Sequence, residues 1–477
     1  MPDLIDDYRM LSGAVDTLRR YWSGRQVILL ANQFTHSTQL LIDEVAACGA
    51  TLVGVVTRPR RTPERDVPTW SCAERGIDLS PHEFEPFLSS PTDSLREWLD
   101  DIDPTQSCVV LGSIWTTMSH LCGRPVHGWR RPEWVAWEDK VRIERLWADL
   151  GIPSPRHVVM SVDDPGLREQ AMALDGGRGV VMAVDSSQGV PGGGGKGLRW
   201  VRSSAEFDAA LKSFTGKTRQ VRIAEFVEGV PCSTQALALD AGIAVFEPAE
   251  EAMLRDPCSG DFRYCGTSTW WRAPDTAKDT IEAYARDAGR RLDELTGYRG
   301  IFTVDGLLTD QGFLATELNP RGAGGLGFRP GWPEFPTYLF HRAVQENVLG
   351  IVDLPPESVQ ATFRDVIARH PSFSGTIPLG TGPVAADVVR PGTDTRAYTT
   401  TPSGATVRYQ VGGRTVRVVD VAPASADGTV GPLIAEFVGH LGHPGLVSFS
   451  DDSVRSTLAS VERAADGKPA ARTRGAR

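Results

Sequence analysis

Short apolar runs separated by a helical stretch dominate the first part of the chain. Residues Gln26–Ala31, Thr51–Val56 and Ser107–Gly112 read as buried strands, because each is a brief apolar run with polar or glycine positions at its ends. A helical pattern from Thr38 to Cys48 connects the first two runs, and a charged, proline-containing loop is predicted from Arg58 to Pro68. This alternation predicts a small open α/β sheet.

The middle of the chain combines two helices with a series of strands. A helix is predicted from Glu138 to Leu150, because Gly151 and then Pro153 provide the glycine and proline that commonly end a helix. A second helix, Asp275–Leu295, has an apolar stripe at helical spacing. The predicted strands are Arg156–Ser161, Gly179–Asp185, Leu198–Val201, Val221–Val227, Thr234–Leu239 and Ile243–Glu247.

The pattern then predicts a hairpin and a different C-terminal part. Ile301–Asn319 alternates in the manner of two strands that turn at Asp310–Gly312. Thr376–Val421 is rich in Thr, Val and Gly and predicts a small β-containing domain, with a helix near Gly431–Leu441. The residues from Ala464 onward predict a disordered basic tail.

Composition narrows the class of protein. A chain of 477 residues is expected to divide into about two to four domains. The net charge of −10 argues against a general nucleic-acid binder, and no apolar run approaches the roughly 18–20 residues of a membrane span. The acidic first residues do not resemble a secretion signal, and the seven cysteines contain no CxxC pair. We therefore expect a cytoplasmic protein with reduced thiols, no nucleic-acid partner and no membrane partner.

The hairpin carries the most informative polar side chains. A three-residue turn would pair Thr309 with Phe313 and so place Asp305 opposite Glu317, at about 4.5–5.5 Å. Asn319 shares their face because it lies two residues beyond Glu317. Two carboxylates and an amide oxygen suit Mg²⁺, which leaves coordination sites for phosphate oxygens. The alternative is the solvated face of an edge hairpin.

Three further motifs are weaker when each is taken alone. The run Gly192–Gly195 followed by Lys196 predicts a flexible loop that could cover phosphate, although a mobile surface turn is the commoner meaning. Lys140, at the start of a predicted helix, could reach a phosphate or could be an exposed helix residue. The strand Ile223–Val227 could offer backbone groups to a planar heterocycle, or could be an ordinary core strand.

The order of these motifs resembles that of the ATP-grasp superfamily over roughly residues 25 to 345, most specifically in Asp305 with the string Glu317–Arg321. The resemblance implies an α/β and α+β protein whose parts follow in sequence. These are an open α/β pre-ATP-grasp domain (1–137), a two-lobed ATP-grasp fold (138–350, with a lid lobe at about 155–230), a small β-containing C-terminal domain (356–462) and the disordered basic tail (463–477).

The resemblance also implies roles for individual residues, with ATP and Mg²⁺ as cofactors. Lys140 would contact phosphate, and the lid Gly193, Gly194, Gly195 and Lys196 would close over the phosphates. Glu225, Phe226 and Val227 would give backbone contacts to adenine, while Asp305, Glu317 and Asn319 would hold Mg²⁺. Arg321 and Lys196 are the catalytic candidates.

Two positions depart from the family's usual pattern. Ala183 stands where a second phosphate-binding lysine is expected, and Lys196 could substitute for it from the loop. Pro231 stands where a ribose-binding glutamate is expected, and Glu228 could serve instead.

The string Gly229–Ser233, the preceding domain and the added C-terminal domain make the chain similar to pheganomycin-type peptide ligases. The implied reaction is ADP-forming amide synthesis through an acyl phosphate, in specialised-metabolite (antibiotic) biosynthesis. A small-molecule carboxylate donor and an amino-acid or peptide acceptor are the expected partners, and a homodimer is a further option. Arg255, Arg263 and Arg329 could bind a substrate carboxylate or could simply be solvated.

Three other functions remain open at this stage. The chain could be a nucleotide-binding module without catalysis, because of the substitutions at Ala183 and Pro231. It could be an ATP-grasp ligase with an acceptor other than an amine. It could also be a nicotinamide-dependent oxidoreductase, although the first predicted strand lacks the GxGxxG that would favour one.

Overall fold

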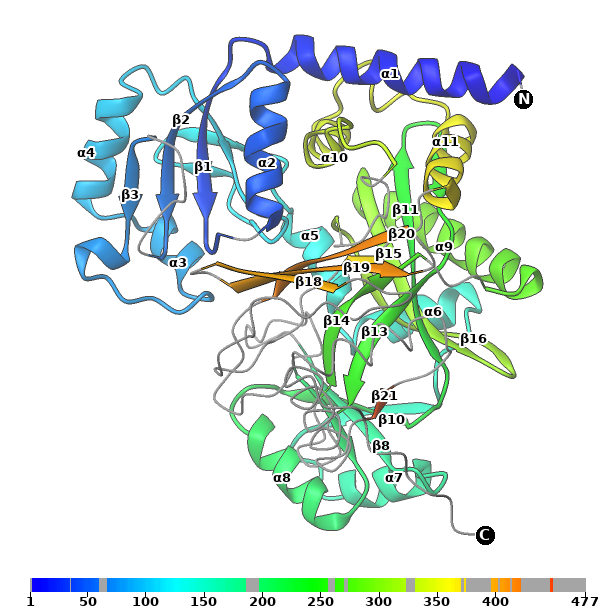
Figure 1. The fold of residues 1–477 in the computed structure, drawn as a ribbon. Helices are drawn as coiled ribbons and strands as arrows, with labels where there is room; N and C mark the ends of the chain where they lie inside the picture. The colour runs from blue at the N-terminus through cyan, green and yellow to red at the C-terminus, as the bar shows by residue number, and fades with distance from the viewer. Residues whose placement is uncertain are drawn as a thin grey trace, which may run out of the picture.

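In the computed structural model, the chain forms separate β-sheets with helices packed on them (Figure 1). The residues that it describes are 2–34, 36–59, 67–185, 197–255, 262–269, 273–322, 331–369, 373–374, 396–401, 404–411, 414–421 and 447–448. Within this part of the chain, no helix is both long enough and apolar enough to span a bilayer.

The first sheet has six strands in the order β3-β2-β1-β4-β6-β5. The three strands that the sequence predicts, β1 (Gln26–Ala31), β2 (Thr51–Thr57) and β4 (Val109–Leu111), lie side by side and parallel, which confirms the open α/β sheet. The strands that the sequence pattern did not reveal are only two to four residues long: β3 (Thr69–Ser71), β5 (His120–Leu121) and β6 (Arg124–His127). The helical elements of this part are α2 (His36–Ala47), η1 (Ala73–Arg75), α3 (Phe84–Ser89) and α4 (Asp93–Ile102).

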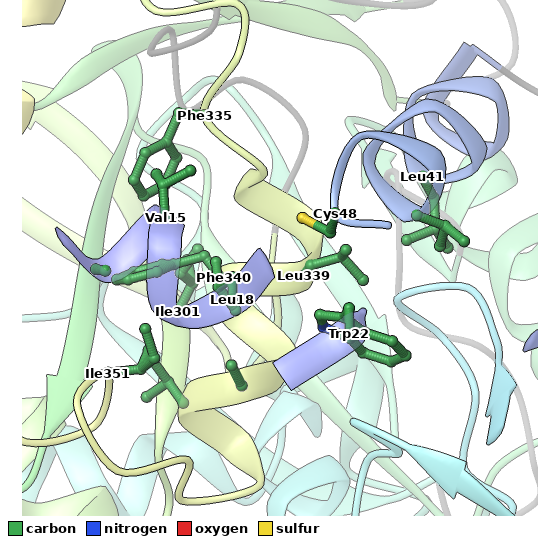
Figure 2. Close-up of a cluster of buried hydrophobic side chains, with 14 of the residues drawn as sticks. Val15, Leu18, Trp22, Leu41, Cys48, Ile301, Phe335, Leu339, Phe340 and Ile351 are labelled. Atoms are coloured by element: carbon green, nitrogen blue, oxygen red, sulfur yellow. The ribbon is translucent and has the colours of Figure 1, made fainter. Parts of the chain in front are cut away.

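A long N-terminal helix, α1 (Pro2–Trp22), was not predicted. It buries Leu11, Val15, Leu18 and Trp22, whose spacing of four, three and four residues is that of one helix face. This face packs against α10 (Thr337–Gln345) and α11 (Pro356–Arg369). Figure 2 shows Val15, Leu18 and Trp22 near Phe335, which precedes α10, and near Leu339 and Phe340 within it. The first and last described helices therefore share one core.

A second, four-stranded sheet has the order β7-β10-β8-β9 and is antiparallel throughout. Its strands are β7 (His157–Ser161), β10 (Gln220–Glu225), β8 (Val180–Val184) and β9 (Leu198–Val201). The helices α7 (Leu167–Leu174) and α8 (Ser204–Phe214) pack on one face of this sheet and form its core (Figure 1).

The largest sheet has eight strands, six of them in the order β16-β15-β11-β13-β14-β17. These six are β16 (Gly312–Asn319), β15 (Gly300–Thr309), β11 (Val230–Leu239), β13 (Ala249–Arg255), β14 (Phe262–Ser268) and β17 (Phe373–Ser374). In addition, β12 (Gly242–Val245) pairs with β11, and β21 (Val447–Ser448) pairs with β13. The helices α6 (Ile143–Leu150) and α9 (Asp275–Thr296) pack on one face. The sequence pattern missed β13 and β14.

The helix predicted from Glu138 begins five residues later, at Ile143. Before it, α5 (Pro132–Val135) runs into a 3₁₀ turn, Ala136–Glu138. The Asp139 carboxylate then accepts hydrogen bonds from the N–H groups of Val141 and Arg142, at 2.8 and 2.9 Å, and so forms a turn ahead of the helix. The predicted end is confirmed, because Gly151 adopts the left-handed conformation after Leu150.

The hairpin exists, but its turn was predicted one residue wrong. Thr309 pairs with Gly312 rather than with Phe313. A bulge between Asp305 and Gly306 then shifts the register by one, so Asp305 still pairs with Glu317. Near the turn, Phe313 and Ala315 are buried, whereas Leu314 between them is only partly buried.

In the C-terminal part, β18 (Arg396–Thr401), β19 (Gly404–Val411) and β20 (Arg414–Val421) form a three-stranded antiparallel sheet. They agree with the β-character predicted for that stretch. The helix predicted near Gly431–Leu441 and the basic tail lie outside the described residues. Of the cysteines, Cys48, Cys72, Cys108, Cys122 and Cys232 are described and are free thiols.

Candidate functional site

Two carboxylates face each other across β15 and β16. Asp305 pairs directly with Glu317 in the ladder, as the sequence predicted. The Lys140 ammonium nitrogen lies 2.7 Å from Glu317 Oε2, so an ion pair joins the turn before α6 to this hairpin. Lys140 is buried rather than exposed, which rules out the surface-residue interpretation.

Asp305 is held by hydrogen bonds to both carboxylate oxygens. Ser233 Oγ donates to Oδ1 at 2.6 Å, and Asn319 Nδ2 donates to Oδ2 at 2.7 Å. Burial, together with the nearby charge of Glu317, raises the pKa of Asp305 to about 6. The surrounding protein therefore stabilises the ionised Asp305 carboxylate less well than water does.

Arg321 is fixed by partners on three sides. Its Nε donates to Glu138 Oε1 at 2.9 Å, and its Nη2 donates to Asn319 Oδ1 at 2.9 Å. Its guanidinium carbon lies 4.0 Å from the centroid of the Trp115 ring, which allows a cation–π contact. Arg130 Nη2 donates to the same Glu138 oxygen at 2.5 Å. The guanidinium group is thus held beside the Asp305–Glu317 pair without a direct ion pair to either.

A third carboxylate on this face, Glu251, escaped the sequence analysis. Ser233 pairs with Asp305 on one side and with Ala249 on the other, so Glu251, two residues beyond Ala249, shares their face. Burial raises the pKa of Glu251 well above its ordinary value, and the charges of Asp305 and Glu317 raise it further. No sequence signal could have revealed this residue, because β13 itself was not predicted.

The residues support a divalent cation in part. Paired carboxylates, one with a raised pKa, are the kind of hard-oxygen site whose charge Mg²⁺ would relieve. Asn319 presents its amide nitrogen to Asp305 and its oxygen to Arg321, so its amide would have to turn to contribute an oxygen. Within the described residues, no three His, Cys, Asp or Glu side chains are arranged to hold a metal by themselves. A metal here would need further oxygens, such as those of phosphate.

The predicted adenine-contacting segment follows the end of β10. The N–H of Glu225 donates to Arg156 O at 2.9 Å, and the N–H of Phe226 donates to Gly179 O at 3.1 Å. These two N–H groups are therefore used by the protein, which leaves Val227 as the better placed of the three to donate to a heterocycle. The Glu225 carboxylate forms an ion pair with Arg156 at 2.6 Å.

Aromatic and charged neighbours surround this segment. The Phe226 ring stacks on that of Trp200 with centroids 4.9 Å apart. Glu228, the alternative ribose contact, lies 3.1 Å from Arg178. Its carboxylate would have to leave that pair, or share it, to bind a ribose.

The two departures noted in the sequence have clear structural settings. Ala183 is fully buried in β8 and pairs with Arg222 of β10. Pro231 is buried in β11 and pairs with Leu307. Neither position can supply the polar side chain that the resemblance led us to expect.

Several predicted residues cannot be placed. Gly193, Gly194, Gly195 and Lys196 lie outside the described residues, and so does Arg329. Arg255 and Arg263 lie in β13 and β14, but their side chains are outside the described part. The structure therefore brings together Lys140, Asp305, Glu317, Asn319 and Arg321, and leaves the lid and the three substrate arginines as predictions.

Comparison with known proteins gives one family match. Residues 187–325 match the ATP-grasp domain family. No curated protein matches the chain.

Among solved structures, the biotin carboxylase domain of 2-oxoglutarate carboxylase from Hydrogenobacter thermophilus is similar. It has a TM-score of 0.50 and 12% identity, over 66% of this chain and 69% of that chain. An N5-carboxyaminoimidazole ribonucleotide synthetase has a TM-score of 0.47 and 16% identity, over 70% and 78% of the two chains. The corresponding Aspergillus clavatus synthase has a TM-score of 0.47 and 13% identity, over 71% and 80%. Residues 187–325 therefore match the ATP-grasp domain, and the chain has the mixed α/β, two-lobed architecture of that fold.

Proposed function

We propose that the protein is an ATP-dependent ligase that joins a carboxylate to an amine and releases ADP and phosphate. The observation that carries this proposal is the pairing of Asp305 with Glu317, with Asn319 and Arg321 at the same edge, inside the residues that match the ATP-grasp domain. The similar 2-oxoglutarate carboxylase domain was crystallised with magnesium ADP, and that supports the choice of nucleotide.

The proposed reaction has two steps. A carboxylate oxygen of the donor attacks the γ-phosphorus of ATP, the bond to the bridging oxygen breaks, and ADP leaves. The acceptor nitrogen then attacks the carbonyl carbon of the acyl phosphate, phosphate leaves, and the nitrogen loses a proton. The products are an amide, ADP and phosphate.

The described residues would bind and orient the reactants. Bound Mg²⁺ would neutralise charge on the β- and γ-phosphates, and Asp305, Glu317 and Asn319 are the residues that would hold it. Lys140, which is paired with Glu317, would contact the same phosphates. Arg321 would stabilise the transferring phosphoryl group or the tetrahedral intermediate, because its orientation is fixed before substrate arrives.

The remaining assignments follow from the resemblance to the ATP-grasp superfamily. Gly193, Gly194, Gly195 and Lys196 would close over the phosphates and exclude water from the acyl phosphate. Glu225, Phe226, Val227 and Glu228 would surround the adenine and ribose. The domain boundaries near 137, 350 and 462, a peptide-forming role in specialised metabolism and a homodimer are proposed on the resemblance alone.

A panel of amino acids and peptides, tested in pairs with ATP and Mg²⁺, checks the proposal. Phosphate release that requires both a donor and an acceptor, with ADP as the nucleotide product, is the expected result. With donor alone, hydroxylamine should trap a hydroxamate. AMP and pyrophosphate as products would contradict the mechanism.

A non-catalytic nucleotide-binding module is the second candidate. The buried Ala183 and Pro231 favour it, because both occupy positions where polar nucleotide contacts were expected. Tight ADP binding without turnover of any pair in the panel would support this alternative.

A further inference from the structure

Arg222, in the middle of β10, is a buried cation with an incomplete set of partners. Its side chain is 7% exposed, and its Nε donates to Glu144 Oε1. Its Nη2 is buried and has no hydrogen-bond partner. A buried guanidinium N–H without an acceptor is costly, so an acceptor from outside the protein would be favoured at Nη2.

Arg222 lies on the face of the four-stranded sheet that α7 and α8 do not cover. Its neighbours Val221 and Ile223 belong to the core formed with α7 and α8. Because side chains alternate along a strand, Arg222 points to the opposite face, where its cross-strand partner is Ala183. Figure 1 shows α7 and α8 on the side of β8 and β10 that is away from α6. Arg222 therefore faces the part of the molecule that carries Lys140 and the hairpin.

Two ion pairs lie between this face of the sheet and the candidate metal site. Arg222 pairs with Glu144 at the start of α6, and Lys140 pairs with Glu317 on the hairpin. Lys140 and Glu144 are four residues apart, and the hydrogen bond from Ile143 N to Asp139 O closes a helical turn between them. Lys140 and the carboxylate that binds Arg222 therefore lie one helical turn apart.

β8 leads toward the glycine-rich segment. It ends at Val184, and the sequence continues into that segment shortly afterwards. Ala183, opposite Arg222, is fully buried and offers no polar atom of its side chain to Arg222. A polyanion on this face of the sheet would lie on the side of the lobe that carries Lys140.

We propose that Arg222 binds a phosphate oxygen of the nucleotide through Nη2, with Glu144 orienting the guanidinium through Nε. The proposal rests on the proposed function and assigns the second cationic phosphate contact to β10 rather than to β8. Arg222 is a binding and positioning residue here, since it has no bond to make or break. The competing explanation is a structural ion pair that only joins α6 to β10.

Calorimetric binding of ADP with Mg²⁺, and of adenosine, to the full chain separates these explanations. Arg222→Met should weaken ADP binding by about 10- to 100-fold, the usual range for a charge-assisted hydrogen bond in a buried site, and leave adenosine binding within about twofold. Arg219→Met, which removes an exposed cation just before the same strand, should change neither. If Arg222→Met does not fold, the affinities of Arg222→Lys for ADP and for adenosine are compared in the same way.

Two results would overturn the proposal. One is ADP binding within about twofold of the wild type. The other is an equal loss of ADP and adenosine affinity, which would indicate a structural ion pair only. Failure of the wild-type chain itself to bind ADP or ATP would instead contradict the proposed function, so the two failures are distinguishable.

Discussion

Lys140 Nζ lies 2.7 Å from Glu317 Oε2, so the cation that the resemblance assigns to phosphate contacts a carboxylate that it assigns to the metal. The simplest way to satisfy both assignments is for Lys140 to exchange partners when a nucleotide and its metal bind. Lys140 would then move from Glu317 to a phosphate oxygen, and the metal would take its place at the carboxylate. This exchange gives the site a direct experimental signature.

Lys140→Gln should have opposite effects on metal binding and on turnover. Without nucleotide, the substitution removes the competitor for Glu317, so Mn²⁺ used as a probe should bind more tightly, by about 3- to 10-fold. Turnover should fall because a phosphate contact is lost. Electron paramagnetic resonance of free Mn²⁺ and an ADP-release assay measure the two effects. Unchanged values in both would show that Lys140 has neither role.

Glu317→Gln should leave a folded protein with turnover reduced by at least about 100-fold, because a neutral amide binds Mg²⁺ less well than a carboxylate. Its side chain is 20% exposed, so the substitution opens no cavity in the core. Asp310→Asn, on the exposed turn of the same hairpin, is the matched control and should keep wild-type turnover. Near-normal ADP formation by Glu317→Gln would show that the metal site is misassigned.

Metal affinity should depend on pH through Asp305. Its pKa is raised to about 6, so it is protonated below that pH, and metal affinity should fall by about tenfold per pH unit there. The Ser233 hydrogen bond stabilises the ionised form, so Ser233→Ala should raise the pKa and move the loss of Mn²⁺ binding to higher pH. A shift to lower pH, or none, would contradict this account of the carboxylate.

His341 should make the fold sensitive to mild acid. Its Nδ1 accepts a hydrogen bond from the N–H of Ile301 at 2.9 Å, and burial lowers its pKa to about 3. The unfolded chain takes up a proton near pH 6.5 and the folded chain does not, so stability is lost as pH falls below 6.5. The loss at pH 5 should be about 2 kcal/mol.

His341→Asn supplies the comparison, because its amide oxygen can accept the same bond and does not titrate. Urea unfolding at pH 7 and pH 5 should show a smaller loss of stability for this variant than for the wild type. Equal losses in both proteins would mean that His341 is not the group responsible.

The residue pattern predicted the strands that are long and apolar and the hairpin that pairs Asp305 with Glu317. It misjudged the turn because the bulge that restores the register is a local backbone feature that the alternation does not encode. It missed β13 because the run AEEAMLR places two acidic residues in a strand of a large sheet. Tertiary pairing with β11 and β14, rather than local propensity, makes that strand.

The sequence predicted the chemistry of the candidate site, but not the contacts between its side chains. The residues Asp305, Glu317 and Asn319 could be proposed from their spacing on one hairpin. The contacts of the site join segments that lie far apart in the chain. These contacts are the Lys140–Glu317 ion pair, the Glu138–Arg321 hydrogen bond and the approach of Glu251 to the Asp305–Glu317 pair. Sequence reasoning from one chain has no access to such contacts, because they depend on how separate elements pack.

The most direct test of the proposed reaction follows a carboxylate oxygen. Once the panel has identified a donor, that donor is prepared with ¹⁸O in its carboxylate and is incubated with ATP, Mg²⁺, acceptor and enzyme. The phosphorus NMR spectrum of the products then shows which of them carries the label. Transfer through an acyl phosphate should place one ¹⁸O in inorganic phosphate, with ADP unlabelled. Label in AMP would mean adenylation, and would contradict the mechanism and the roles assigned to Lys140, Asp305, Glu317, Asn319 and Arg321.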